Sequence, residues 1–355
     1  MSQFTRQALT FTLCLITLAF SPLRAQEGDH AHHGADAHAQ HDAHDGEEKF
    51  DTGKLIMHHI GDSHEWEFSK GVSIPLPVIL YSADRKIEIF SSARFHNDQH
   101  EYNGYRLEHG DSEKIVPVDG DRVIYDFSIT KNVASMILGA VILILIFTSV
   151  AKAYSREKGK APKGLQSAME VLVLFIRDEV VKPNVGPNYA KYLPYLLTLF
   201  FFILINNLLG LLPGGANVTG NIAITMVLAI LTFIITHVNS NKHYWKHLVA
   251  PDGLPPALLP VMIPVEIIGV FMKPFSLMIR LFANITAGHI ILLSLFSLIF
   301  IFKSFALAPV ISAFALFMNF IEIMVAFIQA FIFTLLSSMY IGSAIEEHSH
   351  ADHGH

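Results

Sequence analysis

The stretch Pro264–Phe300 is apolar enough to lie in lipid, yet it carries polar and charged side chains at Glu266, Lys273, Arg280, Asn284 and His289. A charge near the middle of a bilayer costs at least about 3 kcal/mol on insertion scales, so such a residue predicts a functional role. Arg280 is the sharpest case, because its guanidinium stays charged in proteins. The fold therefore has to hold Arg280 in the membrane beside a group on which it acts.

The composition predicts a polytopic membrane protein. Of the 355 residues, 52% are hydrophobic and only 16% are charged, and several apolar runs are long. No basic patch exceeds what a membrane loop needs, so we predict no nucleic-acid partner. The single cysteine, Cys14, falls in a predicted signal peptide, and the mature chain is expected to have no disulfide. We find no cofactor motif, no metal site and no enzymatic catalytic site.

The two ends of the chain are predicted to lie outside the membrane. Residues 1–25 read as a signal peptide with an apolar core, although an uncleaved anchor stays open. Residues 26–48 are a His-rich tail, predicted to be disordered and solvated, with loose Zn²⁺ or Ni²⁺ binding as the alternative. Residues 347–355 form a second His-rich tail, predicted to be cytoplasmic.

Residues 49–128 have the composition of a small extramembrane segment on the outer, periplasmic side. Its runs Ile74–Leu80, Lys86–Phe90 and Arg122–Tyr125 have strand-like content. Because the segment offers too little apolar material for a large core, we expect it to pack on the membrane part. That membrane domain is predicted to span residues 129–346.

The fold class predicted for the membrane domain is an all-α polytopic bundle with five membrane-crossing helices. The expected crossings are Val133–Val150, Tyr192–Leu212, Asn221–Val238, Glu266–Phe302 and Leu307–Ile345. The amphipathic stretch Gln166–Val181 is predicted to be an interfacial helix that Pro183 ends. A basic cluster from Lys152 to Lys163 and the basic loop 237–256 are expected inside, which puts the N-terminus outside and the C-terminus inside.

The last two apolar segments are too long for ordinary crossings. Glu266–Phe302 would be about 55 Å long as a helix and Leu307–Ile345 about 58 Å, against a hydrocarbon core of about 30 Å. Ordinary tilts of about 20° do not absorb this excess. We therefore expect strongly oblique helices, or breaks near Pro274 and Gly288.

The polar residues of these two segments form stripes. Glu266, Lys273 and Arg280 recur every seven residues, flanked one turn away by Ser276 and Asn284, whereas His289 points roughly the opposite way. Asn319, Glu322 and Gln329 form one stripe on the final segment. Such a set suits a proton pathway, because titrating groups pass protons and amides solvate charged states. The alternative is that His289 and Glu322 merely pair as polar glue between helices, which is also how we read Asn206 and Asn207.

At these residues the chain resembles subunit a of the F-type ATP synthase. The resemblance rests on the blocks Lys273-Pro274, Arg280-Leu281-Phe282-Ala283-Asn284 and Gln329-Ala330-Phe331-Ile332-Phe333, with Asn207–Pro213 in support, and covers roughly residues 130–348. It implies a stationary subunit beside a rotating c-ring, in contact with peripheral stalk b subunits and the remainder of the complex. It also implies a multi-pass protein of the bacterial inner membrane.

The resemblance implies a role for each polar position. Arg280 would be the essential arginine that faces the rotor carboxylate. The outer half-channel would be lined by Asn284, His289, Glu322 and Gln329, and the inner one by Glu266 and Ser276. Many bacterial members carry the acid on the arginine helix and the histidine on the last helix, and here the two are exchanged. A pair that works in either order suggests that His289 and Glu322 meet across the helix interface.

Two other function classes remain open from the residues. A secondary cation/proton antiporter also uses intramembrane charges, but it usually shows internal repeats, which we do not see here. A His-rich metal-handling membrane protein would need ligands within the spans, whereas these histidines concentrate in the tails. The residues are compatible with either H⁺ or Na⁺ as the transported ion.

Overall fold

The computed structural model describes residues 61–69, 72–82, 84, 86–97, 100–108, 112–119, 122–156, 159–212, 214–249, 259–302 and 308–345. The predicted signal peptide, residues 1–25, lies outside the described residues. So do both predicted His-rich tails, 26–48 and 347–355, and the first residues of the predicted outer segment.

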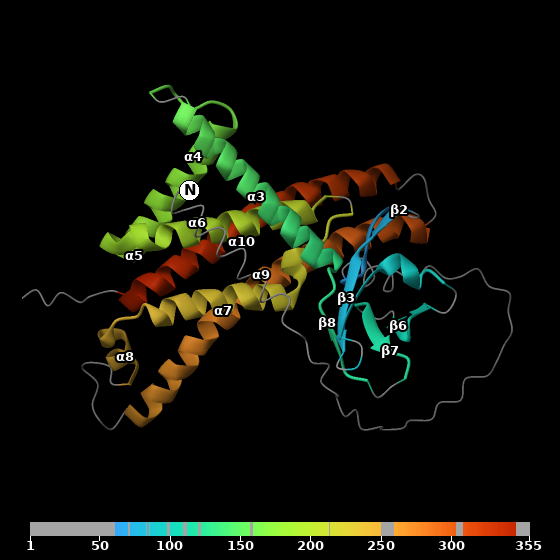
Figure 1. The fold of residues 1–355 in the computed structure, drawn as a ribbon. Coiled ribbons are helices and arrows are strands. Elements are labelled where there is room, and N and C mark those ends of the chain that lie inside the picture. The colour runs from blue at the N-terminus through green and yellow to red at the C-terminus, as the bar shows by residue number, and fades with distance from the viewer. Residues whose placement is uncertain are drawn as a thin grey trace, which may run out of the picture.

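Short antiparallel strands make up most of the described part of the outer segment (Figure 1). They are β1 (Glu65–Ser69), β2 (Val72–Pro75), β3 (Pro77–Ser82), β4 (Lys86–Ser91), β5 (Glu101–Tyr102), β6 (Tyr105–Glu108), β7 (Lys114–Pro117) and β8 (Ile124–Asp126). Their pairing orders are β1-β2, β4-β3-β8 and β5-β6-β7. A small core fills the space between them, with Val78, Leu80, Phe95 and Tyr105 at its centre.

The outer segment is joined to the membrane helices by buried polar contacts. Asp62 accepts hydrogen bonds from the backbone N–H of Asn132 (3.1 Å) and from the Thr130 hydroxyl (2.8 Å), at the start of the first described helix. This carboxylate therefore caps a helix that begins about 70 residues later in the chain. Farther along, the indole N–H of Trp66 donates to the carbonyl of Gly214 at 2.7 Å.

The membrane domain is helical. The helices are α3 (Lys131–Arg156), α4 (Leu165–Phe175), α5 (Lys182–Val185), α6 (Tyr189–Gly210), α7 (Ile222–Val238), α8 (Lys242–Val249), α9 (Leu259–Phe302) and α10 (Ala308–Ile345). Among the described residues, four helical stretches are long and apolar enough to cross a membrane, and five if α7 and α8, bent by 103°, count as one. The domain is thus a polytopic helical bundle.

The predicted end of the amphipathic helix at Pro183 is wrong. A π-helical turn at Ile176–Val181 continues α4 into α5, and Pro183 sits within the first two residues of α5. Proline is tolerated within this continuous helix, because a local π-helical turn can re-satisfy the backbone groups that its missing N–H frees. The chain turns instead at Gly186, whose φ of +70° favours glycine, before α6 begins.

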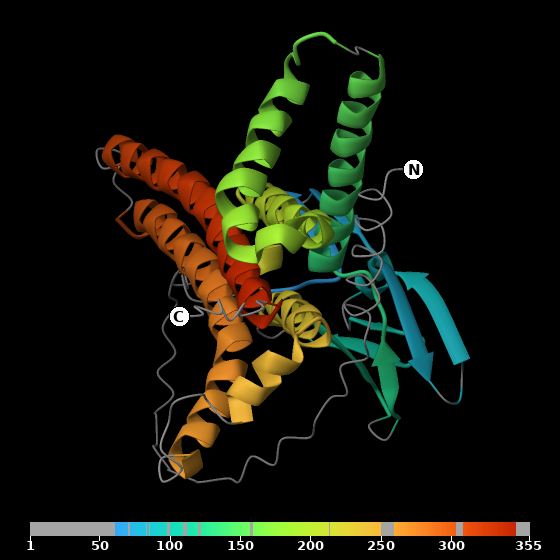
Figure 2. The same cartoon turned by 90° about the vertical axis from the view of Figure 1, so that its left-hand side faces the viewer.

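The expected breaks near Pro274 and Gly288 are also wrong. Helix α9 runs without interruption from Leu259 to Phe302, with Pro264 and Pro274 inside it. Its 44 residues correspond to about 66 Å of helix. Figure 2 shows α9 and α10 as a long pair lying side by side, inclined to the α3–α4 hairpin.

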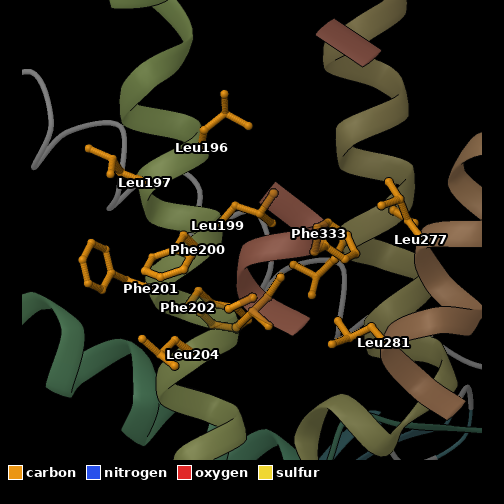
Figure 3. Close-up of a cluster of buried hydrophobic side chains, with 14 of the residues drawn as sticks. Leu196, Leu197, Leu199, Phe200, Phe201, Phe202, Leu204, Leu277, Leu281 and Phe333 are labelled. Carbon is orange, nitrogen blue, oxygen red and sulfur yellow. The ribbon is translucent and has the colours of Figure 1, made fainter. Parts of the chain in front are cut away.

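Helix α6 forms the centre of the bundle. It is apolar on every side, as expected for a helix enclosed by others, and Leu196, Leu199, Phe200 and Ile203 are fully buried. Figure 3 shows this row of side chains beside those of α9 and α10. The ring of Phe201 meets that of Phe147 on α3, with 4.9 Å between centroids. This core holds α9 and α10, which carry most of the polar residues singled out above.

Candidate functional site

His289 on α9 and Glu322 on α10 lie against each other. The His289 Nδ1 and Glu322 Oε1 atoms are 3.4 Å apart, and both residues are buried, with 8% of their surface exposed. Within the described part of the chain, neither His289 Nδ1 nor Glu322 Oε2 has a hydrogen-bond partner. Two titratable groups thus share one buried position and keep unused capacity for a proton or a water molecule.

Gly288 makes room for this pair, and the sequence analysis did not assign it this role. A Cβ atom built at Gly288 would lie 2.7 Å from Glu322 Oε1 and 3.2 Å from Glu322 Cγ. The glycine therefore allows the carboxylate to approach the backbone of α9 closely. In the sequence, Gly288 is marked only by its position next to His289. Its role becomes clear when the facing helix brings Glu322 against it.

Helices α6 and α10 carry further buried amide side chains. The Asn207 side chain donates to the carbonyl of Ala326, one turn beyond Glu322, at 3.2 Å, and accepts from the Thr219 hydroxyl at 2.6 Å. The predicted interhelical role of Asn207 is confirmed. The same prediction for Asn206 is wrong, because Asn206 donates to Phe202 of its own helix at 2.8 Å. Gln329 is buried, two turns after Glu322, with 5% of its surface exposed.

Arg280 lies on the opposite side of α9, which the described helices leave exposed at this position. Arg280 and Asn284 are exposed, whereas Leu277 and Leu281 on the inner side of the helix are buried. Among the described residues no carboxylate pairs with the guanidinium. The arrangement presents a permanent cation to whatever packs against this face of α9.

The remaining predicted residues lie toward the N-terminal half of α9. Ser276, Lys273 and Glu266 are half-buried. The Lys273 ammonium lies over the Tyr340 ring, 5.4 Å from its centroid. A cavity of about 100 Å³ opens beside Glu266 and Lys273, and its other lining residues are Tyr244, His247, Leu248, Gly269 and Val270. The structure therefore separates the predicted polar residues of α9 into a buried pair, an exposed arginine and a cavity group.

The described residues offer no cluster of metal-ligating side chains. Among the described residues there is no group of three or more His, Cys, Asp or Glu side chains that could hold a metal ion.

Models of known protein families match both the outer segment and the membrane domain. A family model described as ATP synthase A chain matches residues 133–342, and one described as a domain of unknown function matches residues 55–133. ATP synthase subunit a of Chlorobium phaeobacteroides (strain DSM 266 / SMG 266 / 2430) is 42% identical over 330 residues, covering 91% of this chain and 83% of the relative.

Two further relatives carry the same name. The protein of Chloroherpeton thalassium is 47% identical over 239 residues, covering 65% of this chain and 71% of the relative. The protein of Anaeromyxobacter sp. (strain Fw109-5) is 38% identical over 339 residues, covering 91% of this chain and 77% of the relative. The similarity therefore extends through the outer segment in some relatives and is confined to about two thirds of this chain in others.

Proposed function

Because the chain belongs to the ATP synthase A chain family, we propose that it is the proton-translocating stator subunit of an F-type ATP synthase, with two offset half-channels beside a rotor carboxylate. The proposal rests on one observation: two functional polar residues of α9 lie on different faces of the helix. Arg280 is exposed on one face, and His289, nine residues later, is buried with Glu322 on the other. Along the helix axis the two positions are about 13 Å apart. The family assignment replaces the antiporter and metal-handling alternatives.

The outer half-channel is assigned to His289, Glu322, Asn284 and Gln329. A proton entering from outside is held by the His289–Glu322 pair, whose two groups lie 3.4 Å apart. It then passes to the carboxylate of the rotor, which becomes neutral and can move into lipid. Asn284 lies on the exposed face one turn from Arg280, where its amide can orient the transfer.

Arg280 acts on the rotor carboxylate without carrying a proton. The guanidinium favours the ionised carboxylate and so promotes release of the proton toward the inner half-channel. Since arginine is not deprotonated in proteins, it also interrupts any direct proton path between the two half-channels. Ser276 and Glu266, on the N-terminal side of Arg280, are assigned to the inner half-channel.

The chain itself binds no nucleotide in this proposal, and its contribution is the conversion of an ion gradient into rotation. One charge crossing 100 mV releases about 2.3 kcal/mol, so several protons are needed for each ATP. The partners are the c-ring, the peripheral stalk b subunits, the remainder of the ATP synthase and the lipid bilayer. The face of α9 with Arg280 is the one assigned to the c-ring.

The topology that we propose is that of a multi-pass protein of the bacterial inner membrane, with the N-terminus outside and the C-terminus in the cytoplasm. The hydrogen bond from Trp66 to Gly214 supports this, since it joins two segments that the charge pattern independently assigns to the outer side. An unbroken α9 of about 66 Å favours a strongly oblique path through the bilayer for α9, and the length of α10 favours the same.

The experiment that tests the function replaces Arg280 by Ala or Gln in the assembled ATP synthase. Both variants are expected to abolish proton-driven ATP synthesis in membrane vesicles, and Arg280→Ala is also expected to raise the passive proton leak. Arg156→Gln, at the cytoplasmic end of α3, serves as the matched control and should keep synthesis. Coupled synthesis by an Arg280 variant at the wild-type level of assembly would overturn the proposal.

A further inference from the structure

A cavity lies where the short helix α8 packs beside the N-terminal half of α9. Its volume is about 100 Å³, and Glu266, Lys273 and Tyr244 contribute polar groups to its wall. A water molecule occupies about 30 Å³ in the liquid and needs two to four polar partners, so the space suits a small cluster of water. Neither Tyr244 nor any other residue of α8 was among the predicted proton-path residues.

The Tyr244 hydroxyl at this cavity is paired with a histidine from another helix. His237, at the end of α7, has its Nδ1 atom 2.8 Å from the carbonyl of Phe233, and its Nε2 atom 3.4 Å from the Tyr244 hydroxyl. Since a carbonyl oxygen only accepts hydrogen bonds, Nδ1 carries the hydrogen, and Nε2 of the neutral ring presents a lone pair to Tyr244. The Phe233 ring, 4.0 Å from the imidazole centroid, holds this orientation.

A second void lies beside this cavity, on the side toward Tyr340. Tyr244 and Lys273 border this smaller void, which Tyr340 and His237 line as well. The Lys273 ammonium lies over the Tyr340 ring, and Tyr340 is close enough to Arg280 to interact electrostatically with it. A route from the cavity toward the exposed arginine would therefore pass Lys273 and Tyr340.

We propose that Tyr244, oriented by His237, is a further proton-path residue at the inner end of this route, and that the cavity between α8 and α9 is where protons meet inner water. The inference rests on the proposed function of the chain. In the transfer step, the Tyr244 oxygen takes a proton from a hydronium ion in the cavity, which becomes water, while the hydroxyl proton of Tyr244 moves to His237 Nε2. The imidazole becomes a cation, and the reverse transfer returns the proton to the cavity.

His237 thus stores a proton beside the cavity, while the charges of Glu266 and Lys273 set the electrostatic potential at the cavity water. The titratable and charged groups that line the two voids are His237 on α7, His247 on α8, Glu266 and Lys273 on α9, and Tyr340 on α10. Loss of the Tyr244 hydroxyl removes the link between the water and the imidazole. The consequence is a change in how the rate depends on inner pH, with the outer pH dependence unchanged.

The first test uses the assembled ATP synthase in inverted membrane vesicles, where the bath is the inner side. Tyr244→Phe and His237→Gln are expected to lower ATP-driven proton pumping severalfold and to flatten its dependence on bath pH. Tyr154→Phe is the matched control, since it also removes a tyrosine hydroxyl that donates a hydrogen bond, to Glu170 on the far α3–α4 hairpin. A merely structural Tyr244 would lower the amount of assembled enzyme and leave the pH profile unchanged, and that result would overturn the inference.

The second test asks whether the cavity holds water that is continuous with the inner side. A Cβ atom at Gly269 would meet no atom within 4 Å, so Gly269→Cys places a thiol in the cavity without a clash. In a Cys14→Ser background, Ag⁺ added to the bath should block pumping by this variant. Ile268→Cys is the control, because Ile268 is 59% exposed on the outer surface of the helix and does not line the cavity. Equal sensitivity of the two variants, or none in Gly269→Cys, would overturn the inference.

Arg280→Ala in the same vesicles separates the two proposals. If Arg280→Ala is inactive and the Tyr244 and Gly269 variants behave like wild type, the cavity assignment fails and the function stands. If Arg280→Ala keeps coupled pumping, the proposed function itself fails.

Discussion

His289 and Glu322 face each other from two different helices, with 3.4 Å between Nδ1 and Oε1 and with both side chains buried. The contact predicts that their order can be reversed. His289→Glu and Glu322→His alone place two like groups together, and each is expected to lower ATP-driven proton pumping at least tenfold. The double exchange restores one acid and one base and should recover most of the rate. The coupling between neighbouring residues is typically about 0.5–3 kcal/mol, which corresponds to a recovery of about twofold to somewhat more than a hundredfold.

Pumping is measured in vesicles with equal amounts of assembled enzyme. A double exchange as inactive as the single variants would contradict the idea that the two groups work as one unit.

Gly288→Ala tests the room that the glycine leaves for the carboxylate. The added Cβ would sit 2.7 Å from Glu322 Oε1, at the flexible end of that side chain, so the carboxylate can turn away at little cost to folding. We expect near-normal assembly together with a several-fold loss of pumping. Ile290→Ala, at a half-exposed neighbouring position, should pump normally. Normal pumping by Gly288→Ala would show that the close approach of Glu322 to α9 is dispensable.

His64 makes the stability of the outer segment dependent on pH. Burial lowers the pKa of His64, but Asp126 at 3.3 Å and Glu113 at 3.6 Å outweigh it and raise the pKa from 6.5 to about 9. A raised folded-state pKa contributes stability that is complete below about pH 6.5 and is lost as the pH rises through about 9. The difference corresponds to about 3 kcal/mol.

Hydrogen exchange of amides 61–69 measures this stability. Protection should fall between pH 7 and 9.5, after correction for the intrinsic exchange rate, and His64→Gln should remove most of the slope. A slope that persists in His64→Gln would assign the pH dependence to another group.

Trp66→Phe tests the second attachment of the outer segment. The substitution keeps an aromatic ring but removes the N–H that donates to the Gly214 carbonyl at 2.7 Å. A neutral hydrogen bond contributes about 1 kcal/mol, so exchange of the amides in the loop 214–220 should rise about fivefold. Trp245→Phe, on α8, changes the other tryptophan of the chain and should leave exchange in this loop as it is. Equal exchange in both variants would contradict docking through Trp66.

The sequence by itself determined which segments are helices of the membrane domain and which side chains have to act within it. Apolar runs mark those helices because a backbone in lipid has to satisfy its own hydrogen bonds, and the computed helices begin and end within a few residues of most runs. Charged residues in such runs stand out for the same reason, and so Arg280 could be chosen before any fold was known. The seven-residue spacing placed Glu266, Lys273 and Arg280 along one stripe.

Only the tertiary structure decided which groups meet. Periodicity describes one helix at a time, whereas the His289–Glu322 contact, the space left by Gly288 and the Tyr244–His237 bond depend on how neighbouring helices pack. Because periodicity describes single helices, some of the sequence-based predictions are wrong. Pro183 and Pro274 lie within helical runs because the surrounding backbone and packing accommodate the missing N–H. Asn206 bonds to its own helix, and its amide lies against Gly139 of α3. Local chemistry therefore selected the residues, and long-range packing assigned their partners.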